Sequence, residues 1–177
     1  MAQTRLLFFS LWESPVGWIG VVGDDEALVE VHFHPESGEV WRRLEAVGAT
    51  LRCGAGGLPE KAIRQLQEYF LGSRRDFDLP LDFQTLPPFC VKTLLVLRNV
   101  AFGKTVTYGE LAQQAGNPRA ARAVGRAMAH NPFPLIVPCH RVVGAGGRLT
   151  GYSGGEGIAT KQWLLDFERR MTEESLG

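Results

Sequence analysis

The stretch that organises this chain reads Ile136-Val137-Pro138-Cys139-His140-Arg141-Val142-Val143. Apolar residues enter and leave it, which predicts a short strand, and its proline restricts the residue before it to extended backbone. A thiol next to an imidazole is a candidate activated nucleophile. In an extended strand the side chains of Cys139 and His140 point to opposite faces, so contact between them needs a kink or a bridging water. The alternative is a buried structural thiol, the common fate of a lone cysteine.

A closing helix is predicted over 160–170. Glu168 lies three and four residues after Leu165 and Leu164, so it shares their inward-facing side. A carboxylate on a buried stripe needs a partner, and His140 is the candidate. Cys139, His140 and Glu168 would then act as a nucleophile, its base, and the residue that orients the base.

Two short helices joined by a tight turn are predicted over about 107–130, which describes a helix-turn-helix. Thr107 and Glu110 match a capping box that opens the first helix, and Gly116 can close it. Asn117-Pro118 predicts the start of the second helix, with proline in the first helical position. Small residues and arginines three or four apart suit this second helix to close approach to DNA. The alternative is a helix packed on its own core, with its arginines in water.

Charge supports an anion-binding surface in the same region. The chain has 177 residues and a net charge of zero, so its overall charge does not indicate a nucleic-acid binder. The segment 111–155, however, contains five arginines and no Asp or Glu. Such a local excess predicts contact with an anion, and chance clustering of solvated arginines is the alternative. These residues are Arg119, Arg122, Arg126, Arg141 and Arg148.

The chain is expected to be cytoplasmic. Its three cysteines are too few for a disulfide framework and lack metal-ligand spacing, so we expect a reducing compartment and no metal. The apolar run 6–12 is too short to span a membrane and lacks the features of a signal peptide.

The N-terminal half reads as a separate α/β domain with an antiparallel sheet, residues 1–85. We place the boundary with the C-terminal domain, 86–177, in the proline-containing irregular stretch 76–88. Alternating and apolar runs separated by turns predict strands, and periodic apolar residues predict helices. The expected strands are 6–12, 18–22 and 28–33, the helices are 40–47, 59–71 and 89–101, and 53–57 is a loop.

Taken together, the second half resembles the O6-alkylguanine-DNA alkyltransferase family, the single-use repair proteins. The resemblance covers roughly residues 89–170, with the matching elements in the family's order. They are Thr107-Tyr108-Gly109-Glu110-Leu111-Ala112, Gly116-Asn117-Pro118-Arg119-Ala120-Ala121-Arg122-Ala123-Val124-Gly125, Asn131-Pro132, Pro138-Cys139-His140-Arg141-Val142-Val143, Gly151-Tyr152-Ser153-Gly154-Gly155, and Lys161 with Trp163-Leu164-Leu165 and Glu168.

The resemblance implies an irreversible, stoichiometric transfer of an alkyl group from guanine O6 to Cys139. His140 would be the base, acting through a water, and Glu168 would orient it. Asn131 would order the active-site turn, and Tyr108 would donate a proton or a hydrogen bond to the departing guanine. No cofactor is implied, and activity on O4-alkylthymine is left open.

The resemblance also implies an N-terminal domain of ribonuclease H-like fold, a mostly helical C-terminal domain with a short active-site strand, and thus an α/β (α+β) protein. The partner would be double-stranded DNA containing O6-alkylguanine, bound by a monomer through the minor groove, with cooperative binding left open. The flipped base would be held by Ser153, Tyr152, Gly154 and Pro134. Arg122 would take the place of the flipped nucleotide, and further DNA contacts would come from Thr107, Asn117, Arg119, Ala120, Ala121, Gly125, Arg126 and Arg141.

Three other functions stay open at this point. A non-catalytic lesion-binding relative would lack the cysteine, so Cys139 argues against it. A helix-turn-helix regulator would need side chains that read base edges, which an alanine-rich helix does not supply. A thiol hydrolase would turn over repeatedly. The sequence departs from the family pattern in two places. Cys90 and Leu94 stand where the family usually has Gln and Trp, and Glu156-Gly157 lengthens the loop at the pocket rim.

Overall fold

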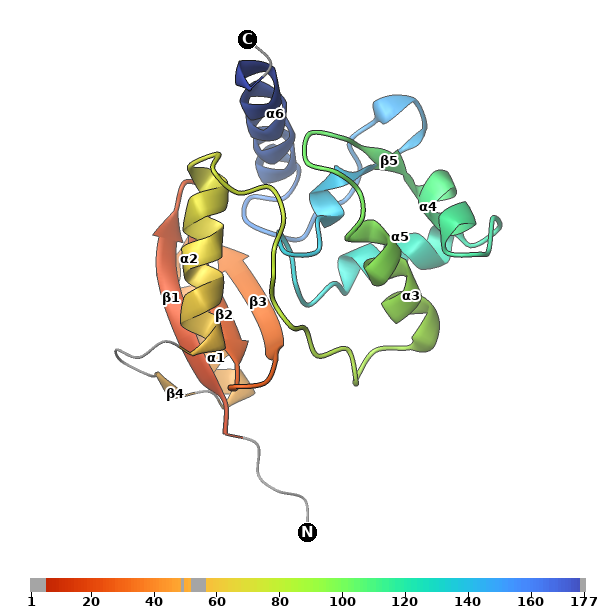
Figure 1. Ribbon diagram of the computed structural model, residues 1–177. Coiled ribbons are helices and arrows are strands. Elements are labelled where there is room, and N and C mark those ends of the chain that lie inside the picture. The colour runs from red at the N-terminus through yellow and green to blue at the C-terminus, as the bar shows by residue number, and fades with distance from the viewer. Residues whose placement is uncertain (1–5, 49, 52–56, 176–177) are drawn as a thin grey trace. The chain divides into compact units, whose positions relative to one another are not determined.

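The computed structural model describes residues 6–48, 50–51 and 57–175. The chain divides into two compact units, residues 1–82 and 83–177, close to the predicted boundary between 85 and 86. We call them the N-terminal and C-terminal units and describe each by itself (Figure 1). Of the loop predicted at 53–57, only Gly57 falls within the described residues.

The N-terminal unit is built on a sheet in the order β3-β2-β1-β4. The apolar and alternating stretches form an antiparallel meander, which confirms the expected strands, and β4 joins β1 in parallel. A tight turn links the first two strands, where Ser14 pairs with Gly17. The strands are β1 (Phe8–Ser14), β2 (Gly17–Gly23), β3 (Leu28–His34) and β4 (Thr50–Leu51).

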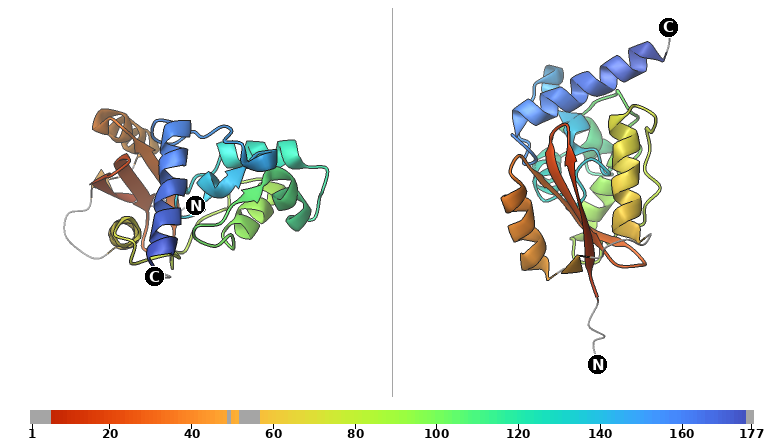
Figure 2. Two further views of the ribbon diagram at one scale, coloured as in Figure 1. Left: turned by 90° about the horizontal axis from the view of Figure 1, so that it is seen from above. Right: turned by 90° about the vertical axis from the view of Figure 1, so that its left-hand side faces the viewer.

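Helices α1 (Ser37–Val47) and α2 (Leu58–Phe70) cover opposite faces of this sheet (Figure 2). Successive side chains of a strand point to opposite faces. In β1, Phe9 packs edge-on against Trp41 of α1, whereas Trp12 contacts Phe70 of α2. Both predicted helices are therefore confirmed, and each buries its apolar side on the sheet.

The C-terminal unit is mostly helical. Its helices α3, α4 and α5 pack against one another, and apolar side chains from each are fully buried between them. Strands β5 and β6 pair in parallel, with Val106 beside Val142. This pairing positions the start of α4 next to the residues that follow Arg141. The elements are α3 (Pro88–Leu97), β5 (Val106–Thr107), α4 (Tyr108–Gln114), α5 (Ala121–Ala129), β6 (Val142–Val143) and α6 (Ile158–Glu174).

The helix-turn-helix is present, and its capping box is confirmed. The Glu110 amide donates to Thr107 Oγ1 at 3.2 Å, and the Thr107 amide donates to Glu110 Oε2 at 2.8 Å. Gly116 then turns the chain with a φ of +83°, a left-handed conformation that favours glycine.

The predicted start of the second helix at Asn117-Pro118 is wrong. Asn117 Oδ1 accepts a hydrogen bond from the Arg119 amide at 3.3 Å, and its carbonyl accepts one from the Ala120 amide at 3.0 Å. The Asn117 side chain thus forms a turn with the Arg119 amide instead of capping a helix, because Asn side chains make both kinds of contact. Helix α5 begins only at Ala121.

None of the helices in the described part of the chain is long and apolar enough to cross a bilayer.

Candidate active site

The Cys139 segment is a turn and not the strand that its apolar flanks predicted. Residues 139–141 form one turn of 3-10 helix, and only Val142 and Val143 are extended. The Cys139 amide donates to the Val137 carbonyl at 2.8 Å, and the Arg141 amide donates to the Pro138 carbonyl at 2.9 Å. These local bonds outweigh the extended preference of the apolar residues on either side. Because the backbone is coiled here, the expected strand alternation of Cys139 and His140 does not apply.

Asn131 organises the approach to this turn. Its side-chain amide donates to the Val137 carbonyl at 2.9 Å, and its Oδ1 accepts from the Phe133 amide at 3.0 Å. Leu135 lies between Phe133 and Val137 in the sequence and has a φ of +71°, which is unusual for a residue other than glycine. Its side chain is almost fully buried. The position agrees with the ordering role expected of Asn131.

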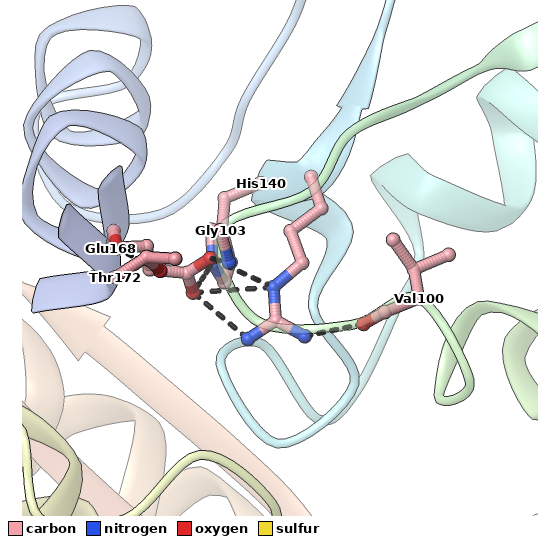
Figure 3. Close-up of polar contacts among 6 residues, drawn as sticks. Val100, Gly103, His140, Glu168 and Thr172 are labelled. Carbon is pink, nitrogen blue, oxygen red and sulfur yellow. Dashed lines mark hydrogen bonds and ion pairs between the residues drawn. The ribbon is translucent and has the colours of Figure 1, made fainter. Parts of the chain in front are cut away.

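The predicted pairing of His140 with Glu168 is present at the centre of the site (Figure 3). His140 Nε2 lies 2.7 Å from Glu168 Oε1, and both side chains are completely buried. The same carboxylate accepts from Arg141 at 2.9 Å through Nη2 and at 3.0 Å through Nε, and from the Gly103 amide at 2.9 Å. Glu168 is therefore the acceptor for three different groups.

Burial and charge set the protonation states of this pair. Burial lowers the pKa of His140 below its ordinary value, although the charge and hydrogen bond of Glu168 raise it. Burial would raise the pKa of Glu168, but the charges and hydrogen bonds of His140 and Arg141 outweigh it and hold that pKa well below its ordinary range. A neutral imidazole that donates through Nε2 leaves Nδ1 as a proton acceptor. His140 Nδ1 is buried and has no hydrogen-bond partner among the described residues.

The thiol of Cys139 is free and 7% exposed. Burial raises its pKa, whereas a hydrogen bond from the Asn131 side chain and the charge of Lys161 lower it. The thiol is thus a buried nucleophile whose ionisation depends on its polar neighbours.

The prediction that Arg141 contacts DNA is wrong. Its guanidinium is 3% exposed and is held by Glu168, by a 2.6 Å bond to the Val100 carbonyl, and by the ring of Phe102 at 5.7 Å. A buried carboxylate needs a fixed counter-charge, and Arg141 supplies it. Its charge therefore does not contribute to the positive surface.

The other expected substrate-binding residues lie in two loops. Ser153 is exposed and Gly154 is buried in the 151–155 loop, and Pro134 is half-buried in the turn before Cys139. Burial raises the pKa of Tyr152 well above its ordinary value, and negative charge on Cys139 and Glu168 acts in the same direction. Its hydroxyl therefore stays protonated.

Tyr108 begins α4 and is half-buried. Its hydroxyl accepts a hydrogen bond from Thr150 Oγ1 at 3.2 Å, which connects it to the residue just before the 151–155 loop.

The expected DNA-contacting residues lie on and before α5. The helix buries Val124, Ala127 and Met128 and exposes Arg122 and Arg126, one helical turn apart. A side chain at Gly125 would meet open space, so this face is free to approach a partner closely. Thr107, Ala120 and Ala121 are half-buried, and Asn117 and Arg119 are exposed in the turn.

Sequence reasoning gave no role to two residues that belong to this site. Lys161 is completely buried, and its signal is its position seven residues before Glu168, on the same side of the helix. Gly103 has a φ of +75°, and a Cβ there would lie 2.5 Å from Thr172 Oγ1. No local pattern marks Gly103, because its contacts come from α6, far away in sequence.

Comparisons with known proteins agree with this geometry. A family model described as "6-O-methylguanine DNA methyltransferase, ribonuclease-like domain" matches residues 7–83, and its "DNA binding domain" counterpart matches 88–170. A methylated-DNA–protein-cysteine methyltransferase from Mycolicibacterium paratuberculosis is 41% identical over 164 residues, covering 93% of each chain.

Solved structures agree as well. The crystal structure of Mycobacterium tuberculosis O6-methylguanine methyltransferase is 37% identical, covers 94% of each chain and superposes with a TM-score of 0.79. A structure of the Mycobacterium tuberculosis protein in complex with DNA is 36% identical, with 93% of this chain and 94% of that chain covered and a TM-score of 0.79. This chain therefore belongs to the O6-methylguanine DNA methyltransferase family, with a ribonuclease-like domain followed by a DNA-binding domain.

Proposed function

We propose that this protein repairs alkylated DNA by moving the alkyl group of O6-alkylguanine onto Cys139, once per molecule. The observation that carries the proposal is the arrangement around the thiol. Cys139 and His140 are adjacent in one buried turn, Glu168 holds His140 Nε2 at 2.7 Å, and His140 Nδ1 is left to accept a proton. A nucleophile, a base and an orienting carboxylate are the parts that covalent catalysis needs.

The chemistry is a single displacement. The thiol proton passes to His140 Nδ1 through a bridging water, and the imidazolium is stabilised by Glu168. The thiolate then forms a bond to the alkyl carbon while the bond between that carbon and guanine O6 breaks, and the electron pair leaves with guanine. A hydrogen bond from Tyr108 stabilises the charge on the leaving base. Guanine takes up a proton, so in net the thiol proton has moved to the base, and Cys139 remains as a thioether.

DNA must deliver a base that is normally inside the stack, so the nucleotide is extruded before reaction. The exposed Arg122 and Arg126 and the open face at Gly125 support entry of α5 into the minor groove, with Arg122 filling the gap. Such binding recognises the DNA backbone and the shape of the groove instead of the base sequence, which suits a search for damage in any sequence. The partner is double-stranded DNA, bound by a monomer in the cytoplasm.

The test is intact mass after incubation with an excess of duplex carrying one O6-methylguanine. The expected result is the mass of one methylene added per protein, mapped by digestion to Cys139, with no further addition over time. Cys139→Ser should gain nothing and keep its DNA affinity, whereas Cys90→Ser, a buried thiol of the same unit, should react like the wild type.

Other outcomes would replace the proposal. Lesion-dependent binding without a mass change would indicate a non-catalytic lesion binder. Repeated turnover of an ester or amide would indicate a hydrolase, and binding to one undamaged sequence would indicate a regulator.

A further inference from the structure

Lys161 is a buried cation in the first turn of α6. Its side chain is 0% exposed, which is rare for lysine. Its ammonium donates to the Val142 carbonyl at 2.6 Å and to the Thr150 carbonyl at 2.9 Å. The first contact is with the residue that follows the Cys139–Arg141 turn, and the second is with the residue that precedes the 151–155 loop. Lys161 thus joins the nucleophile turn to the loop of the expected base-binding residues.

This ammonium lacks a carboxylate partner within the described ranges, where no Asp or Glu lies at ion-pair distance from Lys161 Nζ. The buried carboxylate of the site, Glu168, is engaged by His140 and by two nitrogens of Arg141. Two carbonyls satisfy hydrogen-bond donors but do not balance a charge, and a buried uncompensated charge is costly.

Charge balance identifies the missing partner. Arg141 and Glu168 cancel each other, and neither the imidazole of His140 nor the hydroxyl of Tyr152 carries a charge near neutral pH. With Cys139 as a thiol, the cluster keeps the unbalanced charge of Lys161, and with Cys139 as a thiolate it is neutral. The groups that act on the sulfur are Asn131, the His140 backbone and Lys161, and charge on the sulfur acts in turn on Tyr152 of the 151–155 loop. Arg141 and Glu168 act on His140 instead.

The two groups affect each other reciprocally. Burial raises the pKa of the Cys139 thiol, and the charge of Lys161 lowers it. Burial lowers the pKa of Lys161, and a negative charge on Cys139 raises it. Each group therefore relieves the penalty that burial imposes on the other.

We propose that the ammonium of Lys161 is the buried counter-ion of the Cys139 thiolate. Lys161 is in this sense a positioning residue, because it acts on the reaction through the sulfur and touches neither DNA nor the alkyl group. The inference deepens the proposed function, since alkyl transfer needs the thiolate, but thiolate formation can be measured without DNA.

The same lysine also reaches the proposed leaving-group contact. It holds the Thr150 carbonyl, and Thr150 Oγ1 donates to the Tyr108 hydroxyl at 3.2 Å. A substitution could therefore act through charge or through tethering, and the experiment must separate these two effects.

The test uses Lys161→Gln, which keeps amide donors for the carbonyls but has no charge, and Lys161→Met, which has neither. The exposed Lys104 provides the control, Lys104→Gln. The rate of carboxamidomethylation of Cys139 by iodoacetamide is followed against pH by peptide mapping, which reports this thiol alone. Both Lys161 variants should raise the apparent pKa of Cys139 by at least one unit, an approximately tenfold slower reaction below that pKa. Their rates should approach the wild type at high pH.

A wild-type pH profile in Lys161→Gln would overturn the counter-ion and leave only the tether. A second measurement needs no variant. Alkylation of wild-type Cys139 by iodoacetamide removes the negative charge, so the pKa of Lys161, followed by NMR of its side chain, should fall. An unchanged Lys161 titration would also overturn the inference.

Transfer from methylated duplex is measured in parallel with the wild type. Absence of transfer together with a shifted thiol profile would reject the proposed function and retain the counter-ion. Transfer together with an unshifted thiol profile would retain the proposed function and reject the counter-ion.

Discussion

Replacing Glu168 by Gln tests how much the buried charge cluster contributes to stability. The substitution keeps the shape of the side chain, removes its charge, and turns one acceptor into a donor. The carboxylate accepts hydrogen bonds from two nitrogens of Arg141, from His140 and from the Gly103 amide. The Arg141 nitrogens and the Gly103 amide are donors, as is His140 Nε2 in the tautomer assigned above. The amide nitrogen introduced by the substitution therefore has no acceptor among them, and the guanidinium loses its counter-ion.

The expected loss is large. Removing one partner of a buried ion pair costs about 3–5 kcal/mol, because the other charge is left uncompensated. A domain is stable by roughly 5–15 kcal/mol in total. With a denaturant dependence of about 2 kcal/mol per molar urea, the midpoint of unfolding should fall by about 2 M.

Amide hydrogen exchange in increasing urea, read by mass spectrometry on peptides of α6, reports the free energy of unfolding of the unit that holds the site. The matched control is Glu174→Gln, at an exposed position of the same helix, which should stay within about 0.5 kcal/mol of wild type. Adding Arg141→Met to Glu168→Gln removes the stranded cation and should recover most of the loss. A loss under about 1 kcal/mol in Glu168→Gln, or no recovery in the double variant, would refute the reasoning.

Other predictions concern pH, DNA and backbone. The folded state lowers the pKa values of both His140 and Glu168, so the unfolded chain binds more protons, and the free energy of unfolding should fall as pH drops below 6.5 and again below 4.5; an acid titration without this decline would contradict the assigned states. Arg122→Ala should slow repair in duplex DNA much more than reaction with free O6-benzylguanine, and equal losses would remove its inserted role. Gly103→Ala should lower the melting temperature more than Gly146→Ala, since both have positive φ but only Gly103 lies against α6; similar effects would show that φ alone matters.

Local patterns in the sequence predicted the elements whose cause is local. Apolar runs between turns identified β1 and β2, and alternating residues identified β3. The capping box of Thr107 and Glu110 could be recognised from the sequence because its two partners lie three residues apart. Glu168 was placed correctly by helical periodicity, and its need for a partner pointed to His140.

The errors arose where contacts outside the local pattern decide the outcome, or where one residue type serves two purposes. Apolar flanks favoured a strand at Cys139, but Asn131 holds the Val137 carbonyl and the chain coils after it. The sequence assigned Arg141 to a positive surface, but in the structure its guanidinium is paired with Glu168. Asn117 has the residue type of a helix cap, but the same side chain also closes a turn, and sequence does not distinguish the two.

The two buried charged residues of α6 act on the two groups that exchange the thiol proton, the sulfur of Cys139 and the imidazole of His140. Lys161 and Glu168 lie seven residues apart on one face and carry opposite signs. The cation acts on the sulfur and favours the thiolate, and the anion acts on the imidazole and favours the imidazolium. Lys161 also disfavours the imidazolium, but its influence on His140 is smaller than that of Glu168. The net effect of α6 is to favour transfer of the proton from Cys139 to His140. This transfer leaves the net charge of the site at +1, and the site becomes neutral when the imidazolium passes its proton on.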